Sequence, residues 1–290
     1  MAGILDLIGN TPLVEIKRLS PNPNVKIFGK LEGNNPGGSV KDRAALNMIK
    51  SALDRGDIKP GIKLIEATSG NTGIALALIA SLFDLEIELV LPANSTRERT
   101  LTMEAFGAKV TLLKDIEVCR DYAEEKAAGD DCFMLNQFAN HDNYMAHYKT
   151  TGPEIWRDTN QEITHFVSAM GTTGTIMGCS KYFKEVNPDI QIVGCQPTEG
   201  SSIPGIRRWP EAYLPKIFDP KRVDRVMDIS EEEATLTARK MAKEEGIFAG
   251  MSSGGALSAS IKLAQELTEG TIVFICCDRG DRYLSSSLFG

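Results

Sequence analysis

One lysine stands at the start of a predicted helix, directly behind a glycine-rich loop. Gly37 and Gly38 lie in the loop, and helix-forming residues follow Lys41. The helix dipole disfavours a cation in the first turn, so Lys41 needs an explanation other than helix stability. A lysine that is partly desolvated near an electropositive helix end loses its proton more easily and becomes an amine nucleophile, able to form a Schiff base. The alternative is a solvated surface lysine, the commoner case for this residue type.

A second glycine turn, at residues 68–73, follows an apolar run and precedes a strongly apolar helix pattern. The order is strand, turn, helix, so backbone N–H groups and the positive end of a helix dipole point at whatever lies above the turn. The side chains of Thr68, Ser69 and Thr72 add hydroxyl donors. The turn therefore suits a carboxylate or a phosphate, although a tight connection capped by Ser or Thr has the same sequence.

A third turn, at residues 171–175, repeats this arrangement between a strand pattern and a helix pattern. Its residues are Gly171, Thr172, Thr173, Gly174 and Thr175. The glycines allow close approach and the threonines supply hydroxyls, but the Gly-Lys-Ser/Thr of a nucleotide P-loop is missing. The turn therefore indicates a site for a phosphate monoester. No G-x-G-x-x-G opens a helix near the N-terminus, which disfavours a dinucleotide.

An amine, a carboxylate cradle and a phosphate cradle together fit a pyridoxal phosphate enzyme that acts on an amino acid, because that chemistry needs an anchor for each. A family resemblance appears in the same segments. They are residues 35–43, 66–75, 137–138 with 147–156, 171–175 and 250–255. In this order they resemble the O-acetylserine sulfhydrylase (cysteine synthase) family of fold-type II pyridoxal phosphate enzymes. The match covers nearly the whole chain.

The resemblance implies a role for each motif. Lys41 would carry pyridoxal 5'-phosphate, Asn71 would hydrogen-bond its ring hydroxyl, residues 171–175 would hold its phosphate, and Ser252, rather than Ser253, would face its pyridine nitrogen. A hydroxyl partner leaves that nitrogen largely unprotonated, which favours β-elimination over transamination. The substrate α-carboxylate would be bound by Thr68, Ser69, Gly70, Thr72 and Gln137.

Two more segments, residues 201–210 and 277–285, resemble the B-type branch of this family. The branch implies β-replacement on O-acetylserine by ping-pong kinetics through an α-aminoacrylate, with sulfide giving L-cysteine and thiosulfate giving S-sulfocysteine. Arg207 and Arg208 offer a reason for accepting thiosulfate, because two guanidinium groups receive a dianion better than an apolar loop does. The alternative for this pair is an ordinary solvated loop. Cys277 and Asp278 are expected near the pyridine end of the cofactor.

Other functions stay open at this stage. An O-phosphoserine sulfhydrylase, a cystathionine β-synthase core or a serine/threonine dehydratase could use the same three cradles, and the motifs do not separate acetate from phosphate as leaving group. A non-enzymatic alternative is a scaffold that binds the tail of serine acetyltransferase. We disfavour it, because Lys41 is present and the loop around Arg207 departs from the docking type. The family implies a homodimer.

Composition limits the partners and the compartment. A net charge of −7 argues against nucleic acid, which would need a basic face. The six cysteines lack C-x-x-C spacing and the three histidines lack H-E-x-x-H spacing, so neither a disulfide framework nor a metal site is expected. There is no signal-like N-terminus and no run of 18 apolar residues, which together predict a cytoplasmic protein without membrane association.

Strand and helix patterns alternate along the chain, and this predicts an α/β fold of two domains, each with a helix-flanked, mostly parallel sheet, and an active site in the cleft between them. Strands are predicted at residues 25–31, 62–67, 87–91, 109–113, 163–168, 190–195 and 271–276, and helices from residues 39, 72, 95, 117 and 174 and at 231–245 and 253–267.

The positions that hold these elements together are also predicted. Ser39 and Asp42 form a variant capping box at the first helix. By analogy with the family, a smaller mobile domain covers residues 34–143, and the larger, phosphate-binding domain covers residues 1–33 plus 144–290. The irregular segment 197–220, rich in Pro, Gly and Arg, is the expected mobile loop over the active site.

Overall fold

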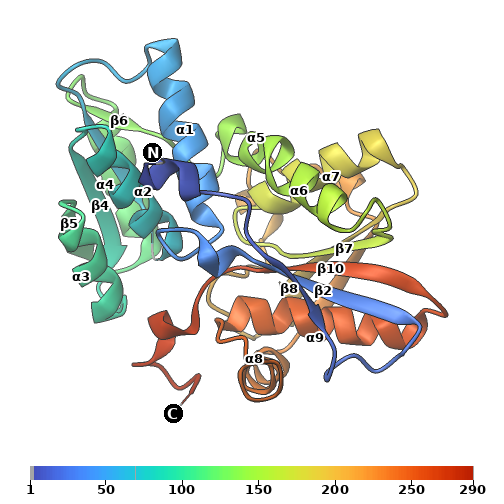
Figure 1. Ribbon diagram of the computed structural model, residues 1–290. Helices are drawn as coiled ribbons and strands as arrows, with labels where there is room; N and C mark the ends of the chain where they lie inside the picture. Colours follow the sequence, from blue (N-terminus) through green and yellow to red (C-terminus); the bar gives the residue numbers. More distant parts are fainter. Residues whose placement is uncertain (1–2, 69, 290) are drawn as a thin grey trace.

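The described residues form two separate sheets with helices on both faces of each (Figure 1). The computed structural model describes residues 3–68 and 70–289. The larger sheet has the order β1-β2-β10-β7-β8-β9, and the smaller has the order β5-β4-β3-β6. All neighbouring strands are parallel except the edge pair β1 and β2. The predicted fold class is therefore confirmed.

The two central strands of the smaller sheet, β3 and β4, are buried on both faces. Its strands are β3 (Lys63–Ala67), β4 (Ile87–Pro92), β5 (Lys109–Leu113) and β6 (Cys132–Met134). One face packs on α1 (Lys41–Arg55), α2 (Asn71–Leu82) and α3 (Arg97–Ala105), and the other on α4 (Ile116–Ala127). Alternate residues face opposite ways: Leu64 and Leu89 contact the first group of helices, whereas Ile65 and Val90 contact α4. Strands covered twice need continuous apolar runs, which explains their pattern.

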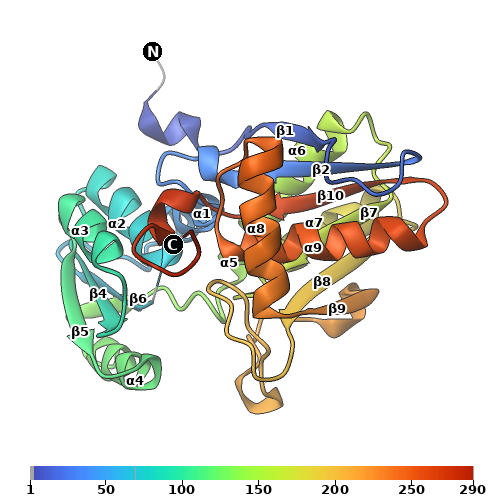
Figure 2. The same cartoon turned by 90° about the horizontal axis from the view of Figure 1, so that it is seen from below.

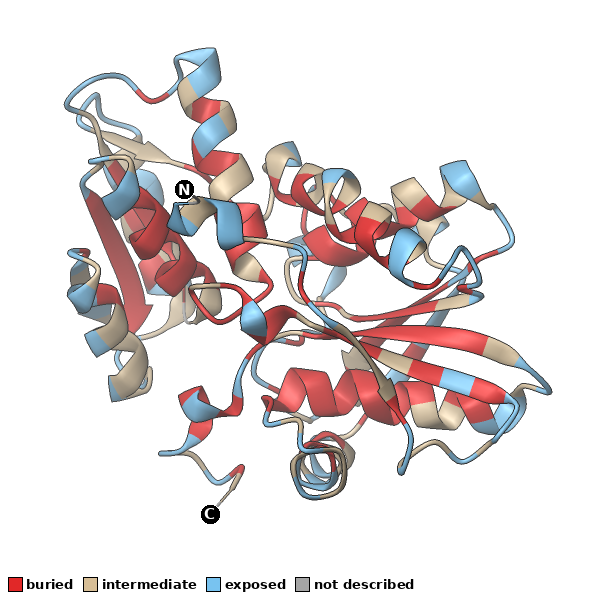
Figure 3. Ribbon diagram, viewed as in Figure 1, coloured by how far each residue is buried: buried red, intermediate tan, exposed pale blue. Residues whose placement is uncertain are grey.

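The larger sheet is covered in the same way. Its strands are β1 (Leu13–Ile16), β2 (Val25–Leu31), β7 (His165–Ala169), β8 (Gln191–Pro197), β9 (Arg225–Ile229) and β10 (Gly270–Cys276). Helices α5 (His141–Lys149), α6 (Thr151–Asp158) and α7 (Gly174–Val186) lie on one face, and α8 (Glu231–Glu245) and α9 (Met251–Glu266) lie on the other (Figure 2). Burial is concentrated in the central strands of both sheets and in α2 and α9 (Figure 3).

Local sequence explains many boundaries. Helix α8 has the predicted bounds because Ser230 and Glu233 form a capping box and Gly246 ends the helix with a φ of 71°. Strands β2 and β5 also have the predicted bounds. The sequence did not single out β1, β6, β9, α5 or α6, because these elements are short or lie at sheet edges. None of the described helices is both long enough and apolar enough to cross a membrane.

The predicted capping box at the first helix is wrong. Helix α1 begins at Lys41, and Val40 is its N-cap residue. A cap at Ser39 would require the helix to begin one residue earlier. The Ser39 hydroxyl accepts from the Lys41 amide at 3.2 Å, while the Asp42 carboxylate accepts from the Gly37 amide at 2.5 Å. Asp42 therefore braces the glycine loop ahead of the helix, whereas Ser39 binds the first amide of the helix. Lys41 is the first residue of the helix.

The two sheets agree with the proposed division of the chain. All four strands of the smaller sheet fall within residues 34–143, and all six of the larger sheet fall outside. Helix α1 links the two parts, because it packs on the smaller sheet while the Val40 amide donates to the Cys277 carbonyl at 2.8 Å, directly after β10. The domain boundaries themselves stay a prediction.

A buried ion network holds the start of α1. The Arg43 guanidinium pairs with Glu32 at 2.7 Å and with Glu154 of α6 at 2.6 Å, and Lys30 of β2 pairs with Glu154 at 2.9 Å. The Thr11 hydroxyl donates to Glu32 at 2.6 Å. Burial alone raises the pKa of Glu154, but hydrogen bonds and charge from Arg43 outweigh it and bring that pKa to about 2. The carboxylates therefore stay ionised and fix α1 against the larger sheet.

We expect Arg43→Met to destabilise the protein by about 3–5 kcal/mol, because it leaves Glu32 and Glu154 buried without their countercharge. Denaturant unfolding measures the loss. The matched control is Lys50→Met, also on α1, which removes an exposed pair with Asp54 and is expected to cost less than about 1 kcal/mol. Equal losses in the two variants would contradict this account.

Candidate active site

A cavity of about 670 Å³ lies at the carboxyl ends of β3, β7 and β10, and residues next to both sheets line it. This edge is where ligands bind in open parallel sheets. It collects every predicted site residue that the structure describes: Lys41, Thr68, Gly70, Asn71, Thr72, Gln137, Gly171, Thr172, Thr173, Gly174, Thr175, Arg207, Arg208 and Ser252. The remaining one, Ser69, lies outside the described residues.

Lys41 is partly buried in the cavity wall. Burial lowers the pKa of its ammonium group, against the charges of Cys277, Asp278 and Glu32, which raise it. In the described part of the chain, no carboxylate lies within ion-pair distance of the Lys41 amine. The amine is therefore more easily deprotonated than a surface lysine, as its place behind the glycine loop predicted.

The second turn and Gln137 form one hydrogen-bonded unit. The Thr72 hydroxyl donates to Gln137 Oε1 at 2.7 Å, and among the described residues the side-chain N–H groups of Gln137 have no acceptor, so they can bind a ligand. The buried Glu66 carboxylate accepts from the Asn136 amide at 2.9 Å and from the Gln137 amide at 3.4 Å. Burial raises the pKa of Glu66 to about 7, although these backbone bonds and Arg120 act in the opposite direction. Glu66, to which the sequence analysis gave no role, thus holds Gln137 in position.

The third turn forms a tight cup at the start of α7. Thr173, at its N-cap, has a left-handed φ of 68°, and its hydroxyl is buried without a partner among the described residues. A Cβ on Gly174 would lie 2.1 Å from Asn143 Oδ1, and one on Gly171 would lie 2.7 Å from the Gly205 carbonyl. Only glycine fits either position. The cup therefore presents backbone N–H groups and an unused hydroxyl, which suits a phosphate.

A buried histidine supports this cup from behind. His147 contacts the Thr151 hydroxyl through Nδ1 at 2.9 Å and the Thr175 hydroxyl through Nε2 at 3.4 Å. Burial lowers the pKa of His147 to about 3, so the ring is neutral near pH 7. His147 is therefore a buried hydrogen-bonding residue. No group of three or more metal-ligating side chains occurs among residues 3–68 and 70–289.

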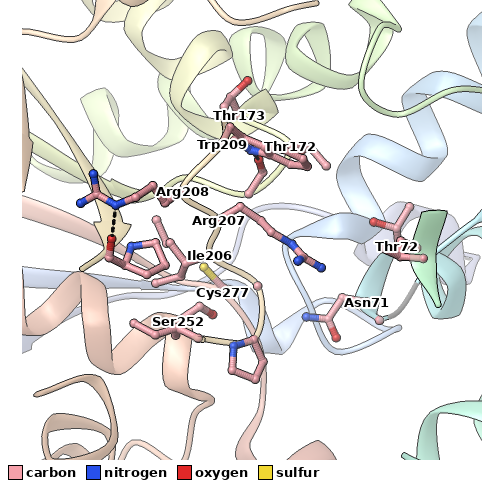
Figure 4. A pocket seen from close by; sticks show the side chains of 18 of the residues that line it. Asn71, Thr72, Thr172, Thr173, Ile206, Arg207, Arg208, Trp209, Ser252 and Cys277 are labelled. Carbon is pink, nitrogen blue, oxygen red and sulfur yellow. Dashed lines mark hydrogen bonds between the residues drawn. The ribbon is translucent and has the colours of Figure 1, made fainter. Parts of the chain in front are cut away.

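The two serines before Gly254 have different surroundings. Ser252 lines the cavity beside Cys277 (Figure 4). Ser253 is fully buried, and its hydroxyl accepts from the Cys277 amide at 2.9 Å. Burial raises the pKa of the Cys277 thiol to about 11, so this thiol is protonated at neutral pH. Of the two serines, Ser252 is the one that lines the cavity, and its contact with the pyridine nitrogen stays a prediction.

The two neighbouring arginines point in different directions. Arg208 donates to the Pro197 carbonyl at 2.8 Å and pairs with Asp228 at 2.6 Å. Arg207 reaches across the cavity toward Asn71 and Thr72 (Figure 4), and it has no ion-pair partner in the described ranges. The sequence could not separate the two, because adjacent residues of an irregular loop have no fixed periodicity.

Trp209 anchors this loop to the rest of the site. Its indole N–H donates to the Gly171 carbonyl at 2.7 Å, and its ring meets Phe138 edge-on with centroids 5.6 Å apart. Gly171 belongs to the phosphate cup and Phe138 follows Gln137. The loop at 197–220 therefore spans the cavity from one cradle to the other, which the sequence analysis did not predict for Trp209.

The site defines a class of protein. A desolvated amine, a carboxylate cradle and a phosphate cup with an unpartnered hydroxyl surround one cavity, as binding and reaction of pyridoxal phosphate with an amino acid require. The family model described as pyridoxal-phosphate dependent enzyme matches residues 4–278. The chain therefore belongs to the pyridoxal-phosphate dependent enzymes.

Two relatives and one solved structure narrow this assignment. Cysteine synthase B of Pseudomonas aeruginosa is 56% identical over 289 residues, which cover 99% of this chain and 97% of that protein. Cysteine synthase B of Escherichia coli is 53% identical and covers 100% of this chain and 97% of that protein. The crystal structure of cysteine synthase from Entamoeba histolytica has a TM-score of 0.94 at 36% identity and covers 100% of this chain and 90% of that one. Within the family the chain thus belongs with the cysteine synthases of B type, as the motifs indicated.

We expect Glu66 to make stability depend on pH. Its pKa rises from 4.5 to about 7 on folding, so its contribution is fully present below pH 4.5 and is lost as the pH rises through 7. Between about pH 5 and about pH 8, wild type should lose roughly 2–3 kcal/mol of unfolding free energy relative to Glu66→Gln. Urea unfolding at both pH values measures this. Glu86→Gln, at an exposed side chain, is the control, and a constant difference between wild type and Glu66→Gln would contradict the prediction.

Proposed function

We propose that this chain catalyses β-replacement on O-acetylserine with pyridoxal 5'-phosphate, so that acetate leaves and sulfide adds to give L-cysteine. The observation that carries the proposal is the meeting of Lys41, the carboxylate cradle and the phosphate cup in one cavity of a cysteine synthase fold. When bound, the cofactor supplies an electron sink for the α-carbon of the substrate. The other roles belong to residues of this chain.

The residues around the cavity have distinct tasks in this proposal. The Lys41 amine removes the α-proton of the substrate and later returns a proton, which its lowered pKa favours. The turn at 68–72 and the amide of Gln137 bind the α-carboxylate. For the cofactor, Asn71 binds the ring oxygen, Ser252 binds the ring nitrogen and the turn at 171–175 binds the phosphate.

Water must be kept away from the activated substrate between loss of acetate and addition of sulfur. The contacts of Trp209 with Gly171 and Phe138 support a role for the loop at 197–220 as a cover. Closure of residues 34–143 over the substrate carboxylate would complete the enclosure. Because acetate leaves before the nucleophile enters, we expect ping-pong kinetics.

Thiosulfate is proposed as a second nucleophile, giving S-sulfocysteine. Arg207 would receive this dianion, because its guanidinium points into the cavity without a carboxylate partner among the described residues. Arg208 would keep the loop in place through Asp228. This modifies the expectation that both arginines bind substrate.

The quaternary state and compartment are part of the same proposal. We infer a homodimer from the family resemblance. All six cysteines have free thiols, which agrees with a reducing compartment such as the cytoplasm.

An O-phosphoserine sulfhydrylase is the second candidate function, because Arg207 could also receive a phosphoryl leaving group.

The test is an absorption spectrum of the purified protein with its cofactor, first alone, then with O-acetylserine, then with thiosulfate or sulfide. We expect the cofactor band to change on addition of O-acetylserine and to return on addition of either nucleophile. Lys41→Ala is the control and should not complete the cycle. A band that responds to O-phosphoserine but not to O-acetylserine would replace the first candidate with the second.

We expect Arg207→Ala to raise KM for thiosulfate roughly 10-fold to 100-fold, because a charge-assisted hydrogen bond to the dianion is lost. The kcat/KM for sulfide should change by less than about threefold. Steady-state kinetics with each nucleophile measures both values. Arg208→Ala is the comparison: its guanidinium is paired with Asp228 and holds the loop, so this variant should weaken the reaction with both nucleophiles alike and not with thiosulfate selectively. Equal loss with both nucleophiles in Arg207→Ala would mean that Arg207 shapes the loop instead of binding thiosulfate.

A further inference from the structure

The side-chain amide of Asn71 is held on two sides by the segment that follows β10. Its Nδ2 group donates to Asp278 Oδ2 at 2.7 Å, and its Oδ1 atom accepts from the Arg282 guanidinium. A carboxylate can only accept at neutral pH and a guanidinium can only donate, so these partners permit a single orientation of the amide. One N–H of the Asn71 amide has no acceptor among the described residues.

The partners are themselves fixed. Asp278 is 1% exposed, and its Oδ2 atom also accepts from the Tyr283 hydroxyl at 2.6 Å. Arg282 lies in the short helix η5 (Gly280–Tyr283), is 8% exposed, and donates to the Gly37 carbonyl in the loop before Lys41. Neither side chain can rotate without breaking other buried hydrogen bonds. The Asn71 amide is therefore set in a rigid frame.

We propose that Asp278 and Arg282 are positioning residues that turn the free N–H of Asn71 toward the cofactor ring oxygen. The amide nitrogen of Asn71 points into the cavity, on the side of Cys277 and Ser252 (Figure 4). A freely rotating amide would present its oxygen part of the time, and an oxygen facing the ring oxygen would repel it. Asp278 and Arg282, together named the Asn71 clamp, prevent that orientation of the amide.

The Asn71 clamp also connects the two sheets. Asn71 begins α2 on the smaller sheet, whereas Asp278 and Arg282 follow the last strand of the larger sheet. Arg282 contacts Asn71 and the loop before Lys41 at once. The cofactor-facing geometry of Asn71 is thus set only when the two parts of the chain are placed as in this structure.

Asp278 variants separate positioning from charge. Asp278→Asn keeps an acceptor oxygen for Asn71 but loses the negative charge, whereas Asp278→Ala loses both. The inference rests on the proposed contact between Asn71 and the cofactor, so Asn71→Ala is measured in parallel. Asp281→Ala is the control, because this exposed carboxylate on the same segment pairs with Arg279.

The measurements use protein and pyridoxal phosphate without substrate. We expect Asp278→Ala to bind the cofactor roughly tenfold more weakly than wild type, as Asn71→Ala should. In both variants the absorbance of the bound cofactor should shift from its long-wavelength band to its short-wavelength band. Arg282→Met should shift the absorbance between these two bands in the same direction, because Asn71 Oδ1 loses its hydrogen-bond donor. Asp278→Asn and Asp281→Ala should stay within about twofold of wild type in affinity.

Two results would overturn the inference in different ways. If Asn71→Ala alters affinity and spectrum but Asp278→Ala does not, or if Asp278→Asn is altered as strongly as Asp278→Ala, the Asn71 clamp does not act as inferred. If the cofactor binds to Asn71→Ala with unchanged affinity and an unchanged spectrum, the proposed contact between Asn71 and the cofactor ring oxygen is wrong, and the inference fails with it. Thermal unfolding of each variant identifies any that are merely unfolded.

Discussion

The pairing of Arg43 with Glu32 and Glu154 is the constraint on which the site depends. Helix α1 packs its apolar face on the smaller sheet, yet its first turn is held by charges that lie beside the larger sheet, on the turn after β2 and on α6. Ions removed from water are stable only when nearly every hydrogen bond is made, so such a network tolerates one arrangement. Lys41 lies two residues before Arg43 and therefore takes a fixed place relative to both sheets.

The cavity contains polar groups that folding alone does not explain. The amine of Lys41 is desolvated, and the hydroxyl of Thr173 is buried without a partner in the described part of the chain. Such groups cost free energy in a folded protein unless a ligand completes their hydrogen bonds. They lie at helix starts and at the carboxyl ends of parallel strands, where the fold already leaves backbone N–H groups unpaired. The site is thus built for anions beside a reactive amine.

Contacts between the two sheets recur around this cavity. Arg43 joins α1 to the larger sheet, Trp209 joins the phosphate cup to Phe138, and Asp278 joins the end of β10 to Asn71. Each of these contacts joins the part of the chain around the smaller sheet to the part around the larger sheet. Each also involves a residue that lines the cavity or lies close to one that does. A change in the relation between the sheets would therefore alter several binding groups together.

The sequence by itself determined most of the elements and several of the chemical groups of this protein. The apolar runs of β2 and β5, the capping box of α8 and the three glycine turns are local signals, because strand burial, helix caps and close backbone approach depend on neighbouring residues. Lys41 and the glycine turns could be found in this way, whereas the family resemblance pointed to Asn71, Gln137 and Ser252 and gave all of them roles.

Only the tertiary structure decided which of these groups act together. It separated Arg207 from Arg208, put Glu66 behind Gln137, and turned the Asp42 carboxylate from a helix cap to the glycine loop. It also set Asp278 and Arg282 on either side of the Asn71 amide. These relations join residues as far as 211 positions apart. Side-chain direction in loops and long-range hydrogen bonding have no period along the chain, so they become defined only when the two sheets pack.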